Sequence, residues 1–104
     1  DQLVFNTWIA NTAHSMGLSV GLKNDNGQTD QLVSHFDWAL DEQCNEFSEC
    51  NTESPFVHAN KAVFNAEYNG DTSFCPSDQS QHINGVLFSL NLDGSGYQPC
   101  TGGW

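Results

Sequence analysis

The sequence predicts an α/β fold in which four parallel strands alternate with helices. Short apolar or alternating segments at residues 18–22, 37–42, 62–68 and 86–92 are typical of strands, and each follows a segment of helical character. Right-handed crossovers between such helix–strand units place the strands side by side in one parallel sheet. The length of 104 residues suits one domain. We therefore expect residues 1–104 to form a single α/β domain.

The first helix is expected over residues 2–16, where apolar side chains recur close to a helical stripe that ends at Gly17. Trp8 lies on this stripe and Trp38 lies within the second strand, so we expect both to be buried in the core. Further helices are expected over residues 29–36, 54–59 and 76–82. The glycine-rich tail 94–104 shows no periodicity.

The charge of the chain excludes several classes of partner. Thirteen acidic residues stand against two lysines and no arginine, which gives a net charge of −11. A basic stripe that could neutralise phosphates cannot be built, so we expect no nucleic-acid binding. Anionic membrane surfaces would repel the chain, and no apolar run approaches the roughly 20 residues of a membrane span. Abundant neutral polar side chains suit a sugar ligand and equally suit extracellular solubility.

The four cysteines predict disulfides in a secreted protein. Their even number in a short acidic chain favours two disulfides over a zinc site, because neither a Cys-x-x-Cys pair nor a nearby His-x-x-x-His pair is present. Three pairings are possible. We expect Cys44–Cys50, which closes a short loop, and Cys75–Cys100, which fixes the tail. The start at Asp1 is read as that of a mature secreted chain, and no metal or cofactor is expected.

Polar residues follow the end of every predicted strand. The carboxyl ends of parallel strands meet at one edge of the sheet, where α/β proteins bind their ligands. Any one of these residues could be a solvated loop residue, but their presence after all four strands favours a site. They are Lys23-Asn24, Glu42-Gln43, Glu67-Tyr68 and Asp93.

Several uncommon strings occur in one order along the chain: DQLVFNTWIANTAHSMGLSVGLKND, FDWALDEQC, FSEC, KAVFNAEY and FC. Together they resemble the C-terminal half of glycoside hydrolase family 114, whose members resemble secreted endo-α-1,4-polygalactosaminidases with a (β/α)8 barrel. The resemblance is dense to about residue 75 and looser to Asp93. It implies that the four strands are half of a TIM-type barrel and that the source is fungal. Cys44 and Cys50 fall on a cysteine pair of that family.

The resemblance also implies that Glu42 is the family's catalytic glutamate. A glycosidase needs two carboxylates that flank the scissile bond, and the family's second one, an aspartate, lies in a segment that precedes Asp1. Asp41 and Glu42 are neighbours on a strand and should point to opposite faces. Glu67, on another strand, is the better candidate for a second acid.

A half-barrel leaves open sheet edges, and open edges pair with other strands. We therefore expect a homodimer. Two copies would either close an eight-stranded barrel or join as a continuous open sheet between helix layers. The tail after the fourth strand covers one edge in the second arrangement, which favours it.

Three functions follow from these observations. The first, favoured by the missing second carboxylate, is a non-catalytic, lectin-like protein for galactosamine or N-acetylgalactosamine glycans, with Tyr68, Tyr97 or Trp104 stacking on a sugar. The second is a residual or dimer-assembled hydrolase of galactosamine polymers with Glu42 as general acid, which requires a raised pKa of Glu42. The third is a secreted effector or defence protein whose strand-end residues are relics. The glycan contacts expected in the first are Lys23, Asn24, Asp25, Glu42, Glu67, Tyr68 and Asp93.

Overall fold

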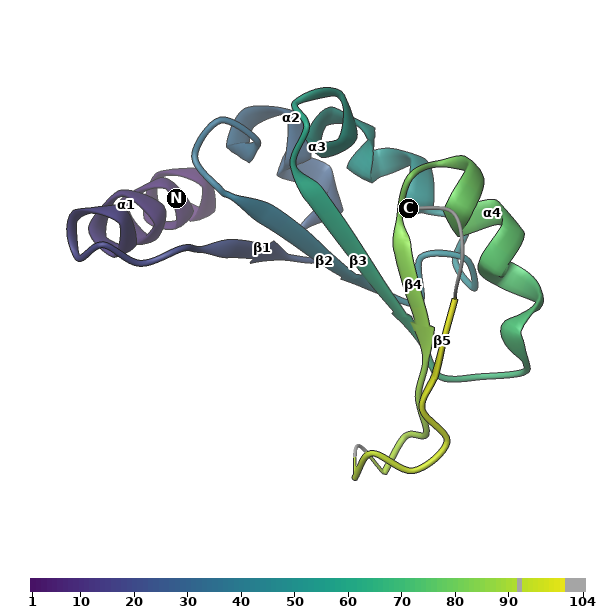
Figure 1. Cartoon of the computed structure of the whole chain (residues 1–104). Coiled ribbons are helices and arrows are strands. Elements are labelled where there is room, and N and C mark those ends of the chain that lie inside the picture. Colours follow the sequence, from purple (N-terminus) through teal and green to yellow (C-terminus); the bar gives the residue numbers. More distant parts are fainter. Residues whose placement is uncertain (92, 101–104) are drawn as a thin grey trace.

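The computed structural model describes residues 1–91 and 93–100 and shows an α/β fold built on one sheet (Figure 1). Trp104, a predicted stacking residue, lies outside the described residues. The sheet has five strands in the order β1-β2-β3-β4-β5, so the prediction of four strands is wrong in number. The first four strands are parallel and the last is antiparallel to β4. The strands are β1 (Gly21–Lys23), β2 (Trp38–Glu42), β3 (Ala62–Glu67), β4 (Asn84–Leu87) and β5 (Gln98–Pro99).

The helices precede the strands as expected. They are α1 (Gln2–Ser15), α2 (Thr29–Leu32), α3 (Ser54–His58) and α4 (Cys75–Ser80), with 3-10 turns η1 (Asn26–Gln28), η2 (Cys50–Glu53) and η3 (Thr72–Phe74). The helix predicted over 29–36 is shorter than expected, because the chain leaves helical geometry after Val33 and turns to bury Phe36. Figure 1 shows α2, α3 and α4 on one side of the sheet and α1 beyond the β1 edge.

The fifth strand arises from the tail, in which the sequence shows no pattern. After Leu87 the chain leaves the sheet and returns antiparallel, with Pro99 opposite Val86 and Gln98 opposite Leu87. A disulfide between Cys75 and Cys100 holds this return on the sheet. The predicted strand over 86–92 is therefore shifted to 84–87. Two residues that include a proline carry no strand signal, which explains why β5 was not expected.

The core lies between the sheet and the helices. Leu22, Ala39 and Val63 occupy one row across β1, β2 and β3, and all three are buried. The alternation of side chains along a strand turns this row toward the helices. The helix side contributes further buried side chains, namely Ala10, Leu32, Phe36, Cys44, Cys50, Phe56 and Ile83.

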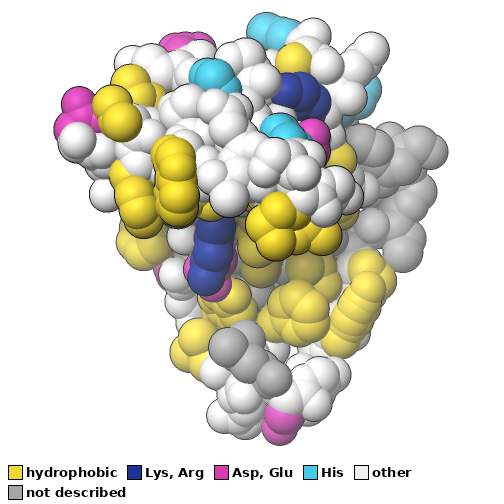
Figure 2. Space-filling model, turned by 90° about the vertical axis from the view of Figure 1, so that its left-hand side faces the viewer, with side chains coloured by type: hydrophobic (Ala, Val, Ile, Leu, Met, Phe, Trp, Pro, Cys, Tyr) yellow, Lys and Arg dark blue, Asp and Glu magenta, His cyan; other side chains and the backbone are white. Residues whose placement is uncertain are grey.

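The opposite face of the sheet, here called the open face, is covered by no helix in the described part of the chain. Trp38, half-buried, meets Phe64 edge to face with ring centroids 5.9 Å apart, and Phe64 is 41% exposed. Gly21 is required here, because a Cβ at this position would come within 2.5 Å of ring carbons of Trp38. Figure 2 shows apolar side chains gathered in the hollow under the upper layer of the molecule. The open face comprises Gly21, Lys23, Trp38, Leu40, Glu42, Ala62, Phe64, Ala66, Asn84 and Val86.

The expectation that Trp8 is buried is wrong. Its side chain is 61% exposed and stacks on Phe5 with ring centroids 6.2 Å apart. Helix α1 lies at the end of the sheet and therefore packs along one side, through Leu3 and the fully buried Ala10. Its other side carries an exposed apolar stripe that comprises Val4, Phe5, Trp8, Ile9 and Met16.

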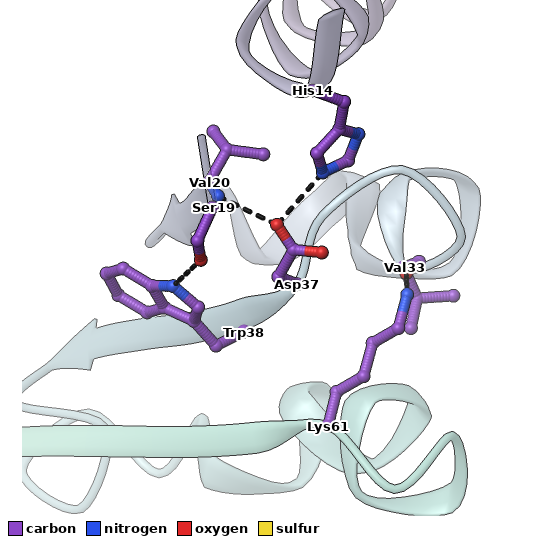
Figure 3. A network of polar contacts seen from close by, with 7 residues as sticks. All are labelled: His14, Ser19, Val20, Val33, Asp37, Trp38 and Lys61. Atoms are coloured by element: carbon purple, nitrogen blue, oxygen red, sulfur yellow. Dashed lines mark hydrogen bonds and ion pairs between the residues drawn. The ribbon is translucent and has the colours of Figure 1, made fainter. Parts of the chain in front are cut away.

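Hydrogen bonds tie the end of α1 to the start of β2 (Figure 3). One oxygen of Asp37 lies 2.9 Å from Nε2 of His14 and accepts a 2.8 Å bond from the amide of Val20. These two bonds hold the pKa of Asp37 below its ordinary value. Next to them, Nε1 of Trp38 donates to Oγ of Ser19 at 3.0 Å. The segment that leads into β1 is thus fixed, and with it the strand that carries Lys23.

Candidate functional site

Glu42 ends β2 on the open face, and both of its carboxylate oxygens have partners. The hydroxyl of Tyr68, just after β3, donates to Oε2 at 2.5 Å. Oε1 lies 3.3 Å from Nζ of Lys23 at the end of β1 and 3.5 Å from Nδ2 of Asn24. Three neighbouring strand ends therefore converge on one carboxylate, as the sequence predicts for the carboxyl edge of a parallel sheet.

The backbone around Asn24 is built to hold Glu42 in place. The side-chain oxygen of Asn24 accepts the backbone N–H of Glu42 at 2.9 Å, and the amide of Asn24 donates to the carbonyl of Leu40 at 2.8 Å. Asn24 and Asp25 both adopt left-handed backbone angles, with φ of 54° and 56°. Asparagine and aspartate tolerate this region better than other non-glycine residues, but two in succession still store strain. The strained turn keeps Asn24 beside β2, where both its backbone and its side chain bond the backbone of that strand.

The partners of Glu42 determine its charge. The hydrogen bond from Tyr68, aided by Lys23 and Asn24, lowers the pKa of Glu42 below its ordinary value. The same bond raises the pKa of Tyr68 to about 12, because ionisation would place two negative charges side by side. Glu42 is therefore a carboxylate at neutral pH. The raised pKa that a general-acid role requires is not found in this arrangement.

A groove of about 640 Å³ runs along the open face, within the usual size range of small-molecule sites. Its polar lining includes Lys23, Glu42 and Tyr68, and its apolar lining includes Phe64, Phe88 and Tyr97. The rings of Phe88 and Tyr97 meet edge to face with centroids 5.4 Å apart, and Tyr97 is 51% exposed. An ionised carboxylate beside exposed aromatic rings can bind a ligand that has both polar and apolar surfaces, as a sugar does.

Two predicted acids lie on the other face of the sheet. Asp41 is 1% exposed and faces the helices, which confirms that it points away from Glu42. Glu67 is also buried, where its Oε2 accepts from the amide of Asn45 at 2.8 Å and from Nδ2 of Asn65 at 2.9 Å. The structure thus does not bring Glu67 into the groove as a glycan contact or as a second acid beside Glu42.

Asp25 and Asp93 are also outside the groove. Oδ2 of Asp25 accepts from the side chain of Asn6 on α1 at 3.0 Å. Asp93 is exposed and accepts from both the amide and the hydroxyl of Ser95, which lowers its pKa. Of the seven predicted glycan contacts, the structure therefore brings together Lys23, Asn24, Glu42 and Tyr68.

A buried polar cluster under the sheet was not anticipated from the sequence. Asp78 of α4 accepts from Nδ2 of Asn45 at 2.6 Å and from Nδ2 of Asn65 at 3.0 Å, while burial raises its pKa. Both expected disulfides, Cys44–Cys50 and Cys75–Cys100, are present. The sulfurs of Cys44 and Cys50 lie near Asp78, but a disulfide has no thiolates to offer a metal. The cluster therefore fixes the loop after β2 on α4.

Two apolar residues that line the groove, Phe64 and Phe88, were not predicted as part of a site. The sequence does carry a signal that places Phe64 on the open face. Ala66 pairs with Glu42, and Phe64, two residues before Ala66 on β3, faces the same side of the sheet. The position of Phe88 depends on the end of β4, which lies earlier than the sequence indicates. Tyr97 was an expected stacking residue, and it does line the groove.

Comparisons with known proteins show what this fold resembles. The crystal structure of Aspergillus fumigatus Ega3 in complex with galactosamine superimposes with a TM-score of 0.83 at 28% sequence identity. The match covers 94% of this chain and 44% of that one, so this chain spans less than half the length of its relative. No curated protein sequence matches the chain. The profile of glycoside-hydrolase family GH114 matches residues 1–103. This chain, with its glutamate at the end of β2, belongs to glycoside-hydrolase family GH114.

Proposed function

We propose that this chain is a secreted, non-catalytic protein that binds galactosamine-type glycans through the groove on the open face. The observation that carries the proposal is the ionised Glu42 held by Tyr68 and Lys23 at the edge of this groove. The crystal structure of its relative was determined with galactosamine, which supports the choice of sugar.

The groove offers groups of the kinds that sugars use. The carboxylate of Glu42 can accept from sugar hydroxyls or from an ammonium group, and the ammonium of Lys23 can donate to sugar oxygens. The exposed ring of Tyr97, which is steadied by Phe88, provides an apolar surface for the C–H face of a pyranose. The net charge of −11 attracts a polymer of positively charged amino sugars from a distance.

The second candidate function is hydrolysis of galactosamine polymers, and membership of a glycosidase family favours it. Two observations weigh against it. The pKa of Glu42 is lowered, whereas a general acid needs it raised. Among the described residues that line the groove, Glu42 is the one carboxylate, since Glu67 faces the helices. Catalysis would therefore need a second carboxylate from outside the described chain.

Secretion and self-association belong to the same proposal. Two disulfides favour an oxidising compartment, and a fungal source fits the Aspergillus relative. No helix in the described ranges is long and apolar enough to cross a membrane. We also propose a homodimer in which the outer edge of β1 pairs with a second copy as an open sheet. At the other edge β5 covers β4, and its Pro99 has no N–H to offer, which disfavours a closed barrel.

A titration of oligogalactosamine into the intact protein tests the binding function. Saturable binding that is lost in Glu42→Gln and retained in Asp30→Asn is expected, because Asp30 is an exposed acid on α2, on the helix side of the sheet. Absence of binding in the unaltered protein would refute the lectin-like function.

Mass spectrometry of the same mixtures tests hydrolysis, and chain shortening that Glu42→Gln abolishes would establish the second candidate instead.

Light scattering measures the mass of the protein in solution and so tests the proposed homodimer. The mass of one chain, 11.4 kDa, would contradict it.

A further inference from the structure

The ammonium group of Lys23 lies where a positively charged ligand would be expected to bind Glu42. We infer that Lys23 is a specificity-determining residue that occupies the ammonium position of this site, so that an amino sugar with a free amine must displace it. This inference rests on the proposed glycan-binding function and names a residue that tunes what the groove binds. Lys23 would lower the affinity for the free amine and leave the affinity for the N-acetylated, uncharged form of the same sugar unchanged, so that the preference of the groove for the amine is smaller than Glu42 alone would give.

The first step of the argument is that one oxygen of Glu42 is open to exchange and the other is not. The hydroxyl of half-buried Tyr68 bonds Oε2 at 2.5 Å, a short distance typical of a charge-assisted bond. Oε1 has two longer contacts, 3.3 Å to Nζ of Lys23 and 3.5 Å to Nδ2 of Asn24. A ligand that binds the carboxylate directly therefore does so at Oε1, where Lys23 already lies.

The second step is that Lys23 can leave without disturbing the fold. Its side chain is 63% exposed, and the ion pair with Glu42 is correspondingly weak. The position of Glu42 depends on Tyr68 and on the backbone bond to Asn24, not on Lys23. The register places Lys23 opposite Leu40, two residues before Glu42 on the same face of the sheet. The lysine thus reaches diagonally over the open face, where it also lines the groove.

The third step concerns charge. With Lys23 in place, the pair of Lys23 and Glu42 is neutral and offers both a donor and an acceptor, which suits hydroxyl and acetamido groups. With Lys23 displaced, the carboxylate alone remains and suits an ammonium group. A free amine must therefore compete with Lys23 for Oε1, whereas a neutral sugar need not.

The test compares two lysine variants that carry the same change of charge. Lys23→Met removes the ammonium and keeps an apolar stem. Lys61→Met is the control, because Lys61 donates to the carbonyl of Val33 at 2.5 Å (Figure 3) and does not line the groove. Calorimetry with galactosamine and N-acetylgalactosamine oligomers of equal length then gives four affinities relative to the unaltered protein. Circular dichroism verifies that both variants are folded.

We expect Lys23→Met to tighten binding of the free-amine oligomer by about two- to fivefold, the range for removing a competing exposed ion pair. Lys23→Met should bind the N-acetylated oligomer no more tightly than the unaltered protein does. Lys61→Met should change the two affinities only by the amount that the loss of one positive charge causes in either variant. Weaker binding of the amine by Lys23→Met, or an equal gain in Lys61→Met, would overturn the inference while leaving glycan binding intact. Failure of every protein to bind either oligomer would refute the proposed function itself, and the inference with it.

Discussion

The hydroxyl of Tyr68 donates a 2.5 Å hydrogen bond to Oε2 of Glu42, which joins the ends of β3 and β2 across the open face. The bond sets the direction of the carboxylate and leaves Oε1 toward Lys23. It also keeps Glu42 charged, because a hydrogen bond to the ionised form stabilises that form. The tyrosine therefore fixes both the orientation and the charge of the Glu42 carboxylate.

Replacement of Tyr68 by phenylalanine should raise the pKa of Glu42, because the bond from Tyr68 is the largest cause of the lowered value. An NMR titration of the carboxyl carbon of Glu42 measures this pKa. Tyr97→Phe is the control, since Tyr97 lines the same groove but is not among the residues that bond the carboxylate of Glu42, which are Tyr68, Lys23 and Asn24. An unchanged titration of Glu42 in Tyr68→Phe would show that the bond does not control its charge.

The stability of the protein should fall as the pH rises from 4.5 to above 7. Burial, aided by the charge of Asp41, raises the pKa of Glu53 from its ordinary value of 4.5 to about 7, and Glu53 is 1% exposed. The folded state therefore binds this proton more tightly than the unfolded chain. The resulting stabilisation is complete below pH 4.5 and is lost by pH 8, and it amounts to about 3 kcal/mol. Urea unfolding at pH 5 and pH 8 measures the difference.

Glu53→Gln removes the titrating group from the same position and should flatten this pH dependence. Burial raises the pKa values of Asp41 and Asp78 as well, so a smaller slope of the same sign should remain. Glu49→Gln is the control, because Glu49 is exposed. A Glu53→Gln variant with the full slope of the unaltered protein would assign the pH dependence to another group.

The approximate positions of the four parallel strands were predictable from the sequence, but β5 was not, and the partners of the strand side chains were only partly so. The sequence around Glu42 predicts its strand and predicts that Glu42 and Asp41 face opposite sides of the sheet, because side chains alternate along a strand. It also predicts Lys23 and Tyr68 as neighbours of Glu42, because the ends of parallel strands lie side by side. Glu67 shows where that reasoning failed. A strand-end residue can face either side of the sheet. Glu67 is two residues after Asn65 on β3, so the two side chains share the helix-facing side, where they form a hydrogen bond.

Long-range contacts account for what the sequence concealed. The stripe of α1 that bears Trp8 has the spacing of a buried face, yet α1 lies beyond the sheet edge and exposes it. Strand β5 depends on the Cys75–Cys100 disulfide and on pairing with β4, neither of which leaves a local pattern. The buried Asp78 resembles an ordinary helix-surface acid until Asn45 and Asn65 come to meet it.

Removal of the Cys75–Cys100 disulfide should loosen β5 before it unfolds the sheet. The disulfide joins residues 25 positions apart, and opening such a loop costs about 3 kcal/mol of stability in the chain-entropy account. The amide at position 100, which donates to the carbonyl of Gly85 at 2.9 Å, reports on β5 directly. Hydrogen exchange of the double variant Cys75→Ser/Cys100→Ser should therefore accelerate at this amide more than at the amide of Gln43, which donates to Ala66 within the parallel sheet. Equal acceleration at both amides would indicate global rather than local opening.

Gly21→Ala should destabilise the protein by about 1–3 kcal/mol, the usual cost of overpacking. The added Cβ would lie 2.5 Å from ring carbons of Trp38, so the indole must tilt away and lose its edge-to-face contact with Phe64. Gly27→Ala is the matched control, because a Cβ there meets no atom within 4 Å and alanine reduces the freedom of the unfolded chain. Urea unfolding followed by tryptophan fluorescence should show a lower midpoint for Gly21→Ala and an unchanged or higher midpoint for Gly27→Ala. Equal midpoints in the two variants would mean that Trp38 does not lie over Gly21 in solution, and the packing of the open face described above would then be wrong.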